Sequence, residues 1–390
     1  MKIKFNLPAV VFALLLFCIL SLQTSTAFAQ GSLTPPGAPA PAMKTLSQIE
    51  PRIPISSAPF TIAQPGSYYL TTNITVSTAT AIIIATNGVT LDLSGFTISS
   101  TAVSANGTGI SINSGLRNIT IANGFIQGSV TNNGSGVYSG GGFSYGIYYT
   151  LNQPVNVLVS RVSISGCQNY GIFLNNAEST VVESCTVQTV GSYGIVASTI
   201  KQSSAFDCGG SAIDGDEVSD CRGQCTGNGT GVYGNVVQNC CGTGNNGNGV
   251  SANNTALNCN GSSSSYTGVS GVNVQNCYGY SAGYIGVSGS TVQNCYGSSN
   301  SSSGTGVNSD IAQSCYGFAS GGTGVYADVA LNCIGYSNGS GYGVESYYIA
   351  NSCYGYCYSG TGVSASIAVT CHGTTSIGTS LSTSHNVNSY

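Results

Sequence analysis

The chain is poor in charge. Asp, Glu, Lys and Arg make up 5% of its 390 residues, against roughly a quarter in an ordinary globular domain. The eight Lys and Arg residues form no basic patch that could displace counterions from nucleic acid, so nucleic acid is not expected as a partner. An apolar content of 41% argues against a disordered Gly/Ser linker, so solubility must come from uncharged polar side chains and the 55 glycines.

The chain also has no Trp and only two His. Zinc sites in proteins use Cys and His at fixed spacings, so the cysteines described below are not expected to form a chain of metal sites. The absence of Trp removes the usual residue that stacks on sugar rings, although 24 tyrosines could take its place. Long apolar runs are missing after the first 29 residues, so no membrane span is expected in the mature protein.

The N-terminus has the pattern of a secretory signal peptide. A basic start (MKIK) precedes a short apolar run (PAVVFALLLFCIL) and a small-x-small pattern that ends at Ala29, after which cleavage is expected. Removal of Lys2 and Lys4 would leave six basic and twelve acidic residues, a net charge of −6. Residues 30–54 are expected to form a Pro-rich linker and N-terminal segment. The predicted location is secreted or periplasmic.

A short repeat dominates the rest of the chain. The pattern [V/A]-x-[N/S/D/T]-Cys occurs eleven times. From Cys221 onward the cysteines follow each other at steps of 18–20 residues, and a Gly-Val pair precedes each later cysteine by eight or nine positions. The eleven repeat cysteines are Cys185, Cys208, Cys221, Cys240, Cys259, Cys277, Cys295, Cys315, Cys333, Cys353 and Cys371.

The length of the repeat predicts its architecture. Helical repeats need about 33–47 residues, so a unit of 18–20 residues rich in Val, Ile, Tyr and Gly predicts two or three short strands instead. Stacked in register, such units form an all-β parallel β-solenoid. We expect it over residues 55–375, from a single chain, with longer and less regular coils in the N-terminal half. Residues 376–390 are expected to form a cap or tail.

Three segments carry a resemblance to a known family. APFTIAQPGSYYL (58–70), GVTLDLSGFTI (88–98) and ITIANGFIQG (119–128) resemble the secreted bacterial right-handed parallel β-helix proteins of the pectate-lyase-like superfamily. The resemblance implies right-handed winding, and it implies little about function because this fold hosts lyases, hydrolases, epimerases and adhesins. The Asn-Thr-Asp and Gly-His-Gly elements of polygalacturonases and the Asp-His strand of pectate lyases are missing.

The repeat cysteines are interpreted as a structural ladder. Fifteen cysteines remain after signal removal, an odd number that cannot pair completely. Parallel neighbours also hold their Cβ atoms farther apart than a disulfide prefers, so we expect stacked buried thiols that behave as small apolar residues. Export permits disulfides, and the alternative to a pure thiol ladder is a few bridges among Cys208, Cys221 and Cys225, where the spacing breaks.

Tyrosines follow the cysteines in two columns. One column directly follows the cysteine and the other lies two positions further on, so alternation places both columns on one face. We expect this face to point inward as an aromatic stack; facing outward, it would offer tyrosine rings to sugars. The candidate ligand-binding residues are Tyr278, Tyr280, Tyr296, Tyr316, Tyr336, Tyr354 and Tyr356.

The acidic residues concentrate in one stretch, DCGGSAIDGDEVSDCR. Asp207 and Asp220 occupy the same slot before a repeat cysteine, so they are expected to lie close together on neighbouring coils. Carboxylate pairs serve glycoside hydrolysis, and clustered oxygens suit Ca²⁺, the one cofactor considered. The candidate catalytic residues are Asp207, Asp214, Asp216, Glu217, Asp220 and Arg222, and the candidate metal ligands are Asp214, Asp216, Glu217 and Asp220.

Uniform coils with few charges favour a secreted protein of structural or binding type, which we expect to be non-enzymatic and to contact polysaccharide or a cell-surface matrix as a monomer. The alternative is a polysaccharide lyase or glycoside hydrolase that uses the acids near residues 207–220. Ice binding ranks last because regular Thr-x-Thr columns are missing.

Overall fold

A computed structural model describes residues 50–78, 80–149, 154–175 and 179–390. The chain divides into two compact units, Met1–Pro51 and Arg52–Tyr390, of which the second is described below. The expected signal peptide and most of the linker lie outside the described residues and stay predictions. Within the described ranges, no helix has the length and apolar character needed to cross a membrane.

The second unit is built from β-strands, and its described residues contain no helix. The first strands are β1 (Ile53–Ile55), β2 (Phe60–Ile62), β3 (Gly66–Leu70), β4 (Ile74–Val76), β5 (Ile82–Ile84), β6 (Val89–Asp92), β7 (Thr97–Ser100), β8 (Thr108–Ile112) and β9 (Arg117–Gln127). They are followed by β10 (Ser129–Asn132), β11 (Tyr138–Gly141), β12 (Tyr145–Tyr149), β13 (Val155–Cys167), β14 (Tyr170–Phe173), β15 (Thr180–Glu183), β16 (Thr186–Val190), β17 (Ile195–Lys201) and β18 (Ser204–Cys208).

From residue 213 onward, strands of two kinds alternate. The first kind covers two sides of each coil: β19 (Ile213–Ser219), β21 (Val232–Gln238), β23 (Val250–Leu257), β25 (Val269–Ser270), β26 (Asn273–Gln275), β28 (Ile285–Gln293), β30 (Thr305–Gln313), β32 (Thr323–Leu331), β34 (Tyr342–Asn351), β36 (Thr361–Val369) and β38 (Thr379–Val387). The second kind has four residues: β20 (Arg222–Cys225), β22 (Cys241–Gly244), β24 (Asn260–Ser263), β27 (Tyr278–Ser281), β29 (Tyr296–Ser299), β31 (Tyr316–Ala319), β33 (Ile334–Ser337), β35 (Tyr354–Cys357) and β37 (His372–Thr375).

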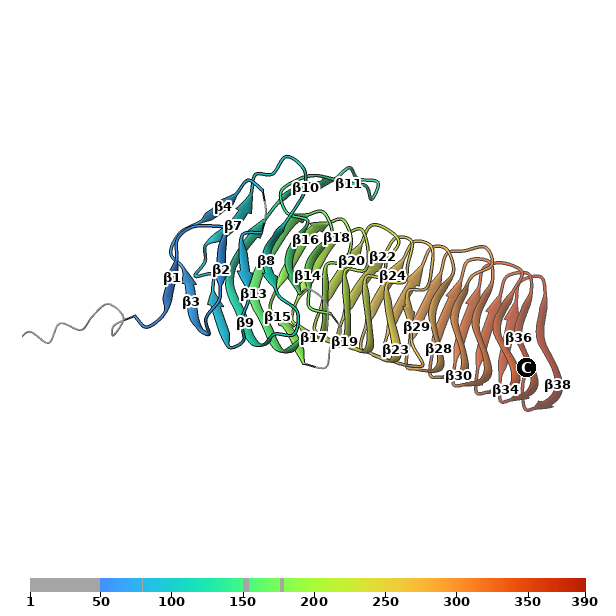
Figure 1. Cartoon of the computed structure of the whole chain (residues 1–390). Helices are drawn as coiled ribbons and strands as arrows, with labels where there is room; N and C mark the ends of the chain where they lie inside the picture. Colours follow the sequence, from blue (N-terminus) through green and yellow to red (C-terminus); the bar gives the residue numbers. More distant parts are fainter. Residues whose placement is uncertain (1–49, 79, 150–153, 176–178) are drawn as a thin grey trace, which may run out of the picture. The chain divides into compact units, whose positions relative to one another are not determined.

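The strands stack in parallel from coil to coil. Each four-residue strand pairs with the next one along the chain, for example β27 with β29 and β29 with β31, and the long strands do the same. Figure 1 shows the coils following one another in sequence order from β1 to β38. This arrangement of about 17 turns is a parallel β-solenoid and confirms the expected fold class. Its right-handed winding stays a prediction.

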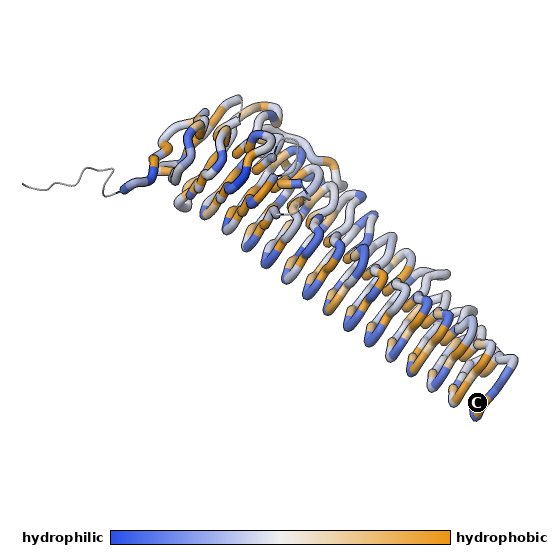
Figure 2. Tube along the Cα trace, turned by 60° about the horizontal axis from the view of Figure 1, so that its bottom comes forward, coloured by the Kyte–Doolittle hydropathy of each residue, from blue (hydrophilic) through white to orange (hydrophobic). Residues whose placement is uncertain are grey.

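One corner of the coil repeats through the whole unit. The residue before each repeat cysteine from Cys221 onward has a left-handed backbone, with φ near +54° at Asn239, Asn258 and Asn276. Asn tolerates this conformation better than most residues, which explains its frequency there. The three side chains also form a ladder, because Asn258 Nδ2 donates to Asn239 Oδ1 (3.1 Å) and Asn276 Nδ2 donates to Asn258 Oδ1 (3.2 Å). Figure 2 shows hydrophilic residues recurring at one edge of successive coils.

Glycine sets the thickness of the C-terminal coils. A Cβ atom on Gly279 would lie 2.0 Å from the carbonyl oxygen of Gly286, on the opposite wall of the same coil. The same approach recurs between Gly297 and Gly306 and through later coils. No side chain fits at Gly279, and a Cβ on Gly286 would lie 2.3 Å from the backbone nitrogen of Ser298 in the next coil, so both positions favour glycine; in the last coil Ser380 takes the second position, opposite Gly373. This preference accounts for the glycine after Cys-Tyr and for the Gly-Val marker of the repeat.

Two segments depart from the regular stack. β10 and β11 form an antiparallel hairpin, which pairs Ser129 with Gly141 and Asn132 with Tyr138. At the other end, residues 379–387 form β38, which pairs in parallel with β36. The solenoid therefore continues past residue 375, where the sequence was expected to turn into a cap or tail.

Candidate functional site: an exposed tyrosine face

Three tyrosines form a stack on one face of the C-terminal coils. Tyr278, Tyr296 and Tyr316 begin β27, β29 and β31, and their backbones pair in register. The ring centroids of Tyr278 and Tyr296 are 5.0 Å apart at an interplanar angle of 7°, and those of Tyr296 and Tyr316 are 4.8 Å apart at 6°. This spacing follows from the distance between parallel strands.

The tyrosine face points to solvent, so the expected inward stack is wrong. Tyr278 is 44% exposed and Tyr296 is 37% exposed, whereas Cys277 and Gly279 on either side of Tyr278 are buried. Successive side chains of a strand point to opposite sides, so an inward cysteine forces the next residue outward. The interior also has no room for a ring, because Gly279 closely approaches Gly286. Alternation from the buried cysteine was the sequence signal that predicts this orientation.

The aromatic face continues into later coils. Ile334 takes the slot of the first column in β33, and Tyr336 fills the gap, with its ring 5.5 Å from Tyr316 and 5.8 Å from Tyr354. Tyr356 lies 5.9 Å from Tyr336, and the ring of His372 stacks on Tyr354 at 5.4 Å. Of the predicted tyrosines, Tyr280 stands apart: its backbone pairs with Ser298, and its hydroxyl accepts a hydrogen bond from Asn300 Nδ2 at 3.0 Å.

The geometry determines what this face offers a ligand. Rings that stack in parallel cover much of each other's faces, so they present ring edges and phenol hydroxyls to solvent. Burial raises the pKa of Tyr296, and burial followed by the neighbouring Tyr296 and Tyr336 raises the pKa of Tyr316, so both hydroxyls stay protonated and can donate. The strands β27, β29, β31, β33 and β35 contain no Asp, Glu, Lys or Arg. The face therefore suits an uncharged, hydroxyl-rich ligand.

A second aromatic patch lies in the N-terminal half, and the sequence analysis missed it. Tyr145 and Tyr148 on β12 stack at 4.4 Å, and Tyr170 and Phe173 on β14 stack at 4.8 Å. Tyr145 pairs in register with Tyr170, and the ring of Tyr193 lies 5.8 Å from that of Tyr170. The Tyr-Gly-Ile triplets that begin β12 and β14 were an available signal, because alternation places the tyrosine before a buried, inward glycine on the outside.

Asp207, a candidate catalytic residue, lies between the β10–β11 hairpin and the coils and is hydrogen-bonded to both. Its carboxylate accepts hydrogen bonds from Asn132 Nδ2 (2.6 Å) and the Tyr138 hydroxyl (2.9 Å), both from the β10–β11 hairpin. The hydroxyls of Thr189 (2.9 Å) and Thr226 (3.3 Å) donate to it from neighbouring coils. Burial raises the pKa of Asp207, but these four hydrogen bonds outweigh burial and the pKa is lowered overall. Asp207 therefore anchors the hairpin to the coils.

Asp207 and Asp220 do not lie in the same column, and this expectation is wrong. Cys208 pairs with Cys225, whereas the backbone oxygen of Cys221 accepts a hydrogen bond from Cys241 of the next coil. The slot of Cys221 is taken in the preceding coil by Ser203, whose hydroxyl accepts a hydrogen bond from the amide of Cys185 (3.1 Å). Cys208 is therefore at another corner of the coil, and the uneven steps of 23 and 13 residues arise because the pattern jumps between two columns.

The remaining acids are spread around one coil. Asp216 and Glu217 are exposed in the middle of β19, and Asp214 pairs in register with Val196 and Tyr233 on an outer face. Asp220 lies at the asparagine corner, where its Oδ1 accepts a hydrogen bond from Asn239 Nδ2 (3.1 Å). Arg222 lies 5.6 Å over the ring of Phe206. No group of three His, Cys, Asp or Glu side chains within the described ranges could hold a metal ion.

The other repeat cysteines occupy the interior of successive coils. All fifteen cysteines of the described ranges are free thiols, and all but Cys241 are buried. Cys277 Sγ accepts a hydrogen bond from the amide of Cys259 (3.3 Å), and Cys295 Sγ accepts one from the amide of Cys277 (3.4 Å). Burial raises the pKa of Cys185 to about 11. A protonated, buried thiol is a poor nucleophile and a poor metal ligand, so Cys185 offers packing and not reactivity. At the last repeat cysteine the direction is reversed, because the hydrogen bond with Cys353 lowers the pKa of Cys371 to about 6.

Comparisons with known proteins add little to this geometry. No family model matches the chain, and no curated protein matches it. Among solved structures, the enzymatically active domain of tailspike protein 2 of bacteriophage CBA120 is 14% identical, with a TM-score of 0.25; the match covers 78% of this chain and 42% of that domain. The A-module of a mannuronan C-5 epimerase of Azotobacter vinelandii is 11% identical, with a TM-score of 0.31, and the match covers 84% of this chain and 89% of that module. The fold assignment rests on the parallel register described above.

Proposed function

We propose that this chain is an exported, non-catalytic β-solenoid that contacts polysaccharide through its tyrosine face. The observation that carries the proposal is the outward stack of the exposed Tyr278 and Tyr296 and the half-buried Tyr316, which presents phenol hydroxyls at the spacing of the coils. A polysaccharide offers hydroxyl groups and apolar ring edges along an extended chain, which matches such a surface. The cysteine and glycine columns would serve to hold this surface straight.

The acidic residues support a non-catalytic assignment. Asp207 uses its carboxylate to hold the hairpin, and Asp220 belongs to the asparagine corner. Hydrolysis of glycosides needs two carboxyl groups that flank one bond, with a fixed separation. Asp216 and Glu217 follow each other on one exposed strand, and neither has a partner acid from a neighbouring coil in register: Glu217 pairs with Thr199 and Val236.

The test is co-sedimentation of the mature protein with insoluble or cross-linked neutral and acidic polysaccharides, with and without Ca²⁺. A variant carrying Tyr278→Ile, Tyr296→Ile and Tyr316→Ile keeps apolar bulk, as Ile334 does naturally in this column, and removes three hydroxyls. We expect its affinity for a neutral polysaccharide to fall by about tenfold or more, since each hydrogen bond contributes about 0.5–1.5 kcal/mol. Tyr233→Ala is the matched control, because Tyr233 lies on β21, away from this face.

The same samples test catalysis. New reducing ends or unsaturated products that disappear in an Asp214→Ala, Asp216→Ala variant would overturn the non-catalytic proposal. If the triple isoleucine variant co-sediments like the parent protein, the tyrosine face does not bind the polysaccharide and this part of the proposal is wrong. Export is tested separately: the N-terminus of protein recovered from the medium or periplasm of expressing bacteria should be Gln30, as the predicted cleavage after Ala29 requires.

A further inference from the structure

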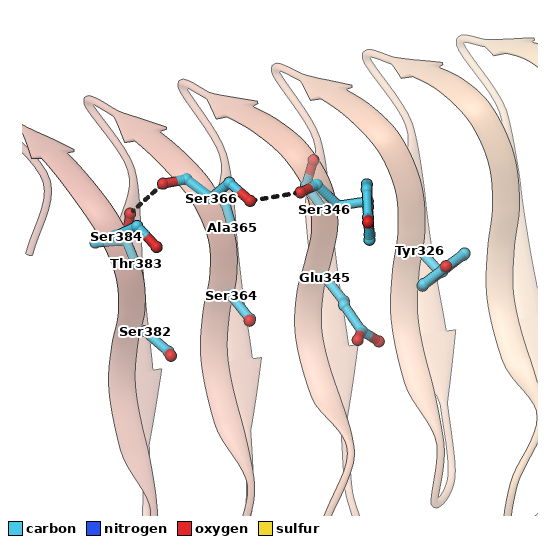
Figure 3. A pocket seen from close by; sticks show the side chains of 10 residues that line it. Tyr326, Glu345, Ser346, Ser364, Ala365, Ser366, Ser382, Thr383 and Ser384 are labelled. Carbon is cyan, nitrogen blue, oxygen red and sulfur yellow. Dashed lines mark hydrogen bonds between the residues drawn. The ribbon is translucent and has the colours of Figure 1, made fainter.

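A groove of about 390 Å³ lies on the long-strand face of the last coils. Figure 3 shows the side chains of Tyr326, Glu345, Ser364 and Ser382 along it, one from each of four successive strands. These residues form one column, because Tyr326 pairs with Glu345, Glu345 with Ser364 and Ser364 with Ser382. The groove exists because two large side chains are followed by two small ones in the same column.

A β-bulge forms the second wall of the groove. β34 has ten residues where β32 and β36 have nine, so Tyr347 and Tyr348 together face the single residue Ser366. The extra residue pushes Tyr347 outward, where its side chain is 62% exposed. Bulges of this kind redirect side chains and recur beside binding sites.

Hydrogen bonds hold this wall in place. The buried hydroxyl of Ser346 lies within hydrogen-bond distance of the backbone oxygens of Asp328 (2.9 Å) and Ile349 (2.8 Å) and shares its one proton between them, which spans the bulge. The hydroxyl of Ser366 donates to the backbone oxygen of Tyr347 at 2.7 Å. These contacts fix the backbone before any ligand arrives, and a fixed wall binds with a smaller loss of entropy.

The polar groups that line the groove are not all used within the protein. Thr323 Oγ1 donates to Glu345 Oε2 at 3.4 Å, and the second carboxylate oxygen, Oε1, has no partner within the described ranges. The hydroxyls of Ser364 and Ser382 likewise lack a hydrogen-bond partner in the part of the chain that the structure describes. Burial raises the pKa of Glu345, and the hydrogen bond from Thr323 offsets part of that effect. Glu345 is thus a half-buried acceptor beside two available hydroxyls.

We infer that this groove binds a neutral sugar unit, with Glu345 and the serine hydroxyls on its hydroxyl groups and Tyr326 or Tyr347 against its apolar edge. The inference deepens the proposed function and rests on it for the class of ligand, but it names a separate site on another face. Tyr326 has no ring partner within the described ranges and is 37% exposed, so its ring face is open, unlike those of the tyrosine stack. A pocket with a few placed polar groups and an aromatic wall is typical of small-ligand sites.

The charge of the groove selects among ligands. Glu345 is the one ionisable carboxyl group that lines it, and no Lys, Arg or His does. An anionic sugar would face this carboxylate without a compensating cation. Ca²⁺ takes six to eight oxygen ligands, usually from several carboxylates, so one carboxylate with serine hydroxyls is a poor calcium site.

The experiment measures binding of neutral oligosaccharides of glucose, mannose and xylose to the full mature chain by calorimetry. Ser364→Tyr should block the groove without disturbing the sheet, since Tyr326 occupies the same column. Glu345→Gln keeps the shape and removes the charged acceptor. We expect Ser364→Tyr to abolish binding and Glu345→Gln to weaken it by about tenfold. Asp310→Asn, an exposed acid outside the groove, is the control and should bind like the parent.

The outcomes separate this site from the tyrosine face. Oligosaccharide binding that survives in the triple isoleucine variant but is lost in Ser364→Tyr supports the groove. The inference is overturned if Ser364→Tyr binds like the parent, if no neutral oligosaccharide binds, if only uronate oligomers bind, or if Ca²⁺ binds in a Glu345-dependent way. The proposal that the tyrosine face binds polysaccharide is tested separately by co-sedimentation, and it is wrong if the triple isoleucine variant co-sediments like the parent. Melting temperatures of all variants show whether a loss of binding reflects misfolding.

Discussion

The N-terminal and C-terminal coils build the same solenoid with different interiors. The fully buried aromatic side chains Phe143 and Tyr149 lie in the N-terminal half, and the fully buried Ile and Leu side chains of the described ranges run from Ile55 to Ile213. After Val232 the buried apolar residues are almost entirely Val, Ala and Cys. Large branched and aromatic side chains hold the N-terminal walls apart, whereas facing glycines bring the C-terminal walls together.

This difference explains why one half is regular and the other is not. A core of Ile, Leu and Phe can be repacked in several ways, so coil length and loops can vary between neighbouring turns. A pair of facing glycines allows no such choice, because any Cβ would overlap the opposite backbone. Strict repetition in the C-terminal half is therefore a consequence of thin coils. The wider N-terminal half carries the hairpin and the second aromatic patch.

The largest effect is expected from a methyl group placed between the thin walls. In Gly297→Ala the new Cβ would lie 2.0 Å from the carbonyl oxygen of Gly306, a distance that real Cβ atoms do not show. The two walls must separate, and we expect a loss of about 3 kcal/mol or more in the free energy of unfolding, measured by urea titration. Gly115→Ala is the N-terminal control: its Cβ meets open space, but its φ of +77° costs about 1–2 kcal/mol. Equal losses in the two variants would contradict the thin-wall explanation.

The sequence predicted the repeat well because repetition averages over local ambiguity. The short spacing of Cys277, Cys295 and the other repeat cysteines excluded helical repeats. A unit of this length predicts the parallel stack of strands that the structure shows. The corner residues were also predictable in kind, since Asn before the cysteine suits a left-handed turn. The same pattern assigned Cys208 to the wrong column. The tetrapeptide that ends at Cys208 matches the repeat pattern, but it lies at a different corner of the coil, where Cys208 pairs with Cys225.

The candidate sites were less accessible to sequence reasoning. Asp207 contacts Asn132 and Tyr138, which lie 75 and 69 residues earlier in the chain, so no local pattern could reveal that it anchors the hairpin. The groove at Glu345 depends on one extra residue in β34. In the sequence this residue lengthens one repeat by a single position, which is indistinguishable from the normal variation in repeat length. Long-range contacts and bulges are where a one-dimensional pattern carries least information.

An intermediate effect is expected at the hairpin of the N-terminal half. Asp207→Ala removes the acceptor of four hydrogen bonds and leaves the largely buried Tyr138 without its carboxylate, so we expect a loss of about 1–3 kcal/mol. Hydrogen–deuterium exchange of residues 129–141 should rise in this variant, while exchange in the C-terminal coils should not change. Exchange that rises equally in both halves would show that the hairpin and the coils unfold together.

The pH dependence of the hairpin gives the same contact a second test. The pKa of Asp207 is lowered in the folded chain, so its contribution to stability is present above the ordinary aspartate pKa of about 3.9 and is lost as the pH falls through the lower, folded value. Attachment of the hairpin should therefore be constant from about pH 5 to 8 and weaken below about pH 4. Asp207→Ala should show the weakened state at every pH, and a parent protein whose hairpin exchange is unaffected by acid would contradict this role for the carboxylate.

The smallest effect is expected on the tyrosine face, because its rings lie outside the buried interior of the coils. Tyr296→Ala removes ring contacts with Tyr278 and Tyr316, and each such contact contributes about 0.5–1.5 kcal/mol beyond burial, so a loss of about 1–2 kcal/mol is expected in urea unfolding. Tyr296→Ile should cost less, about 0.5 kcal/mol, because Ile334 already fills the equivalent slot between Tyr316 and Tyr354. A loss in Tyr296→Ala as large as in Gly297→Ala would mean that the outer stack, and not the thin interior, holds the C-terminal coils together.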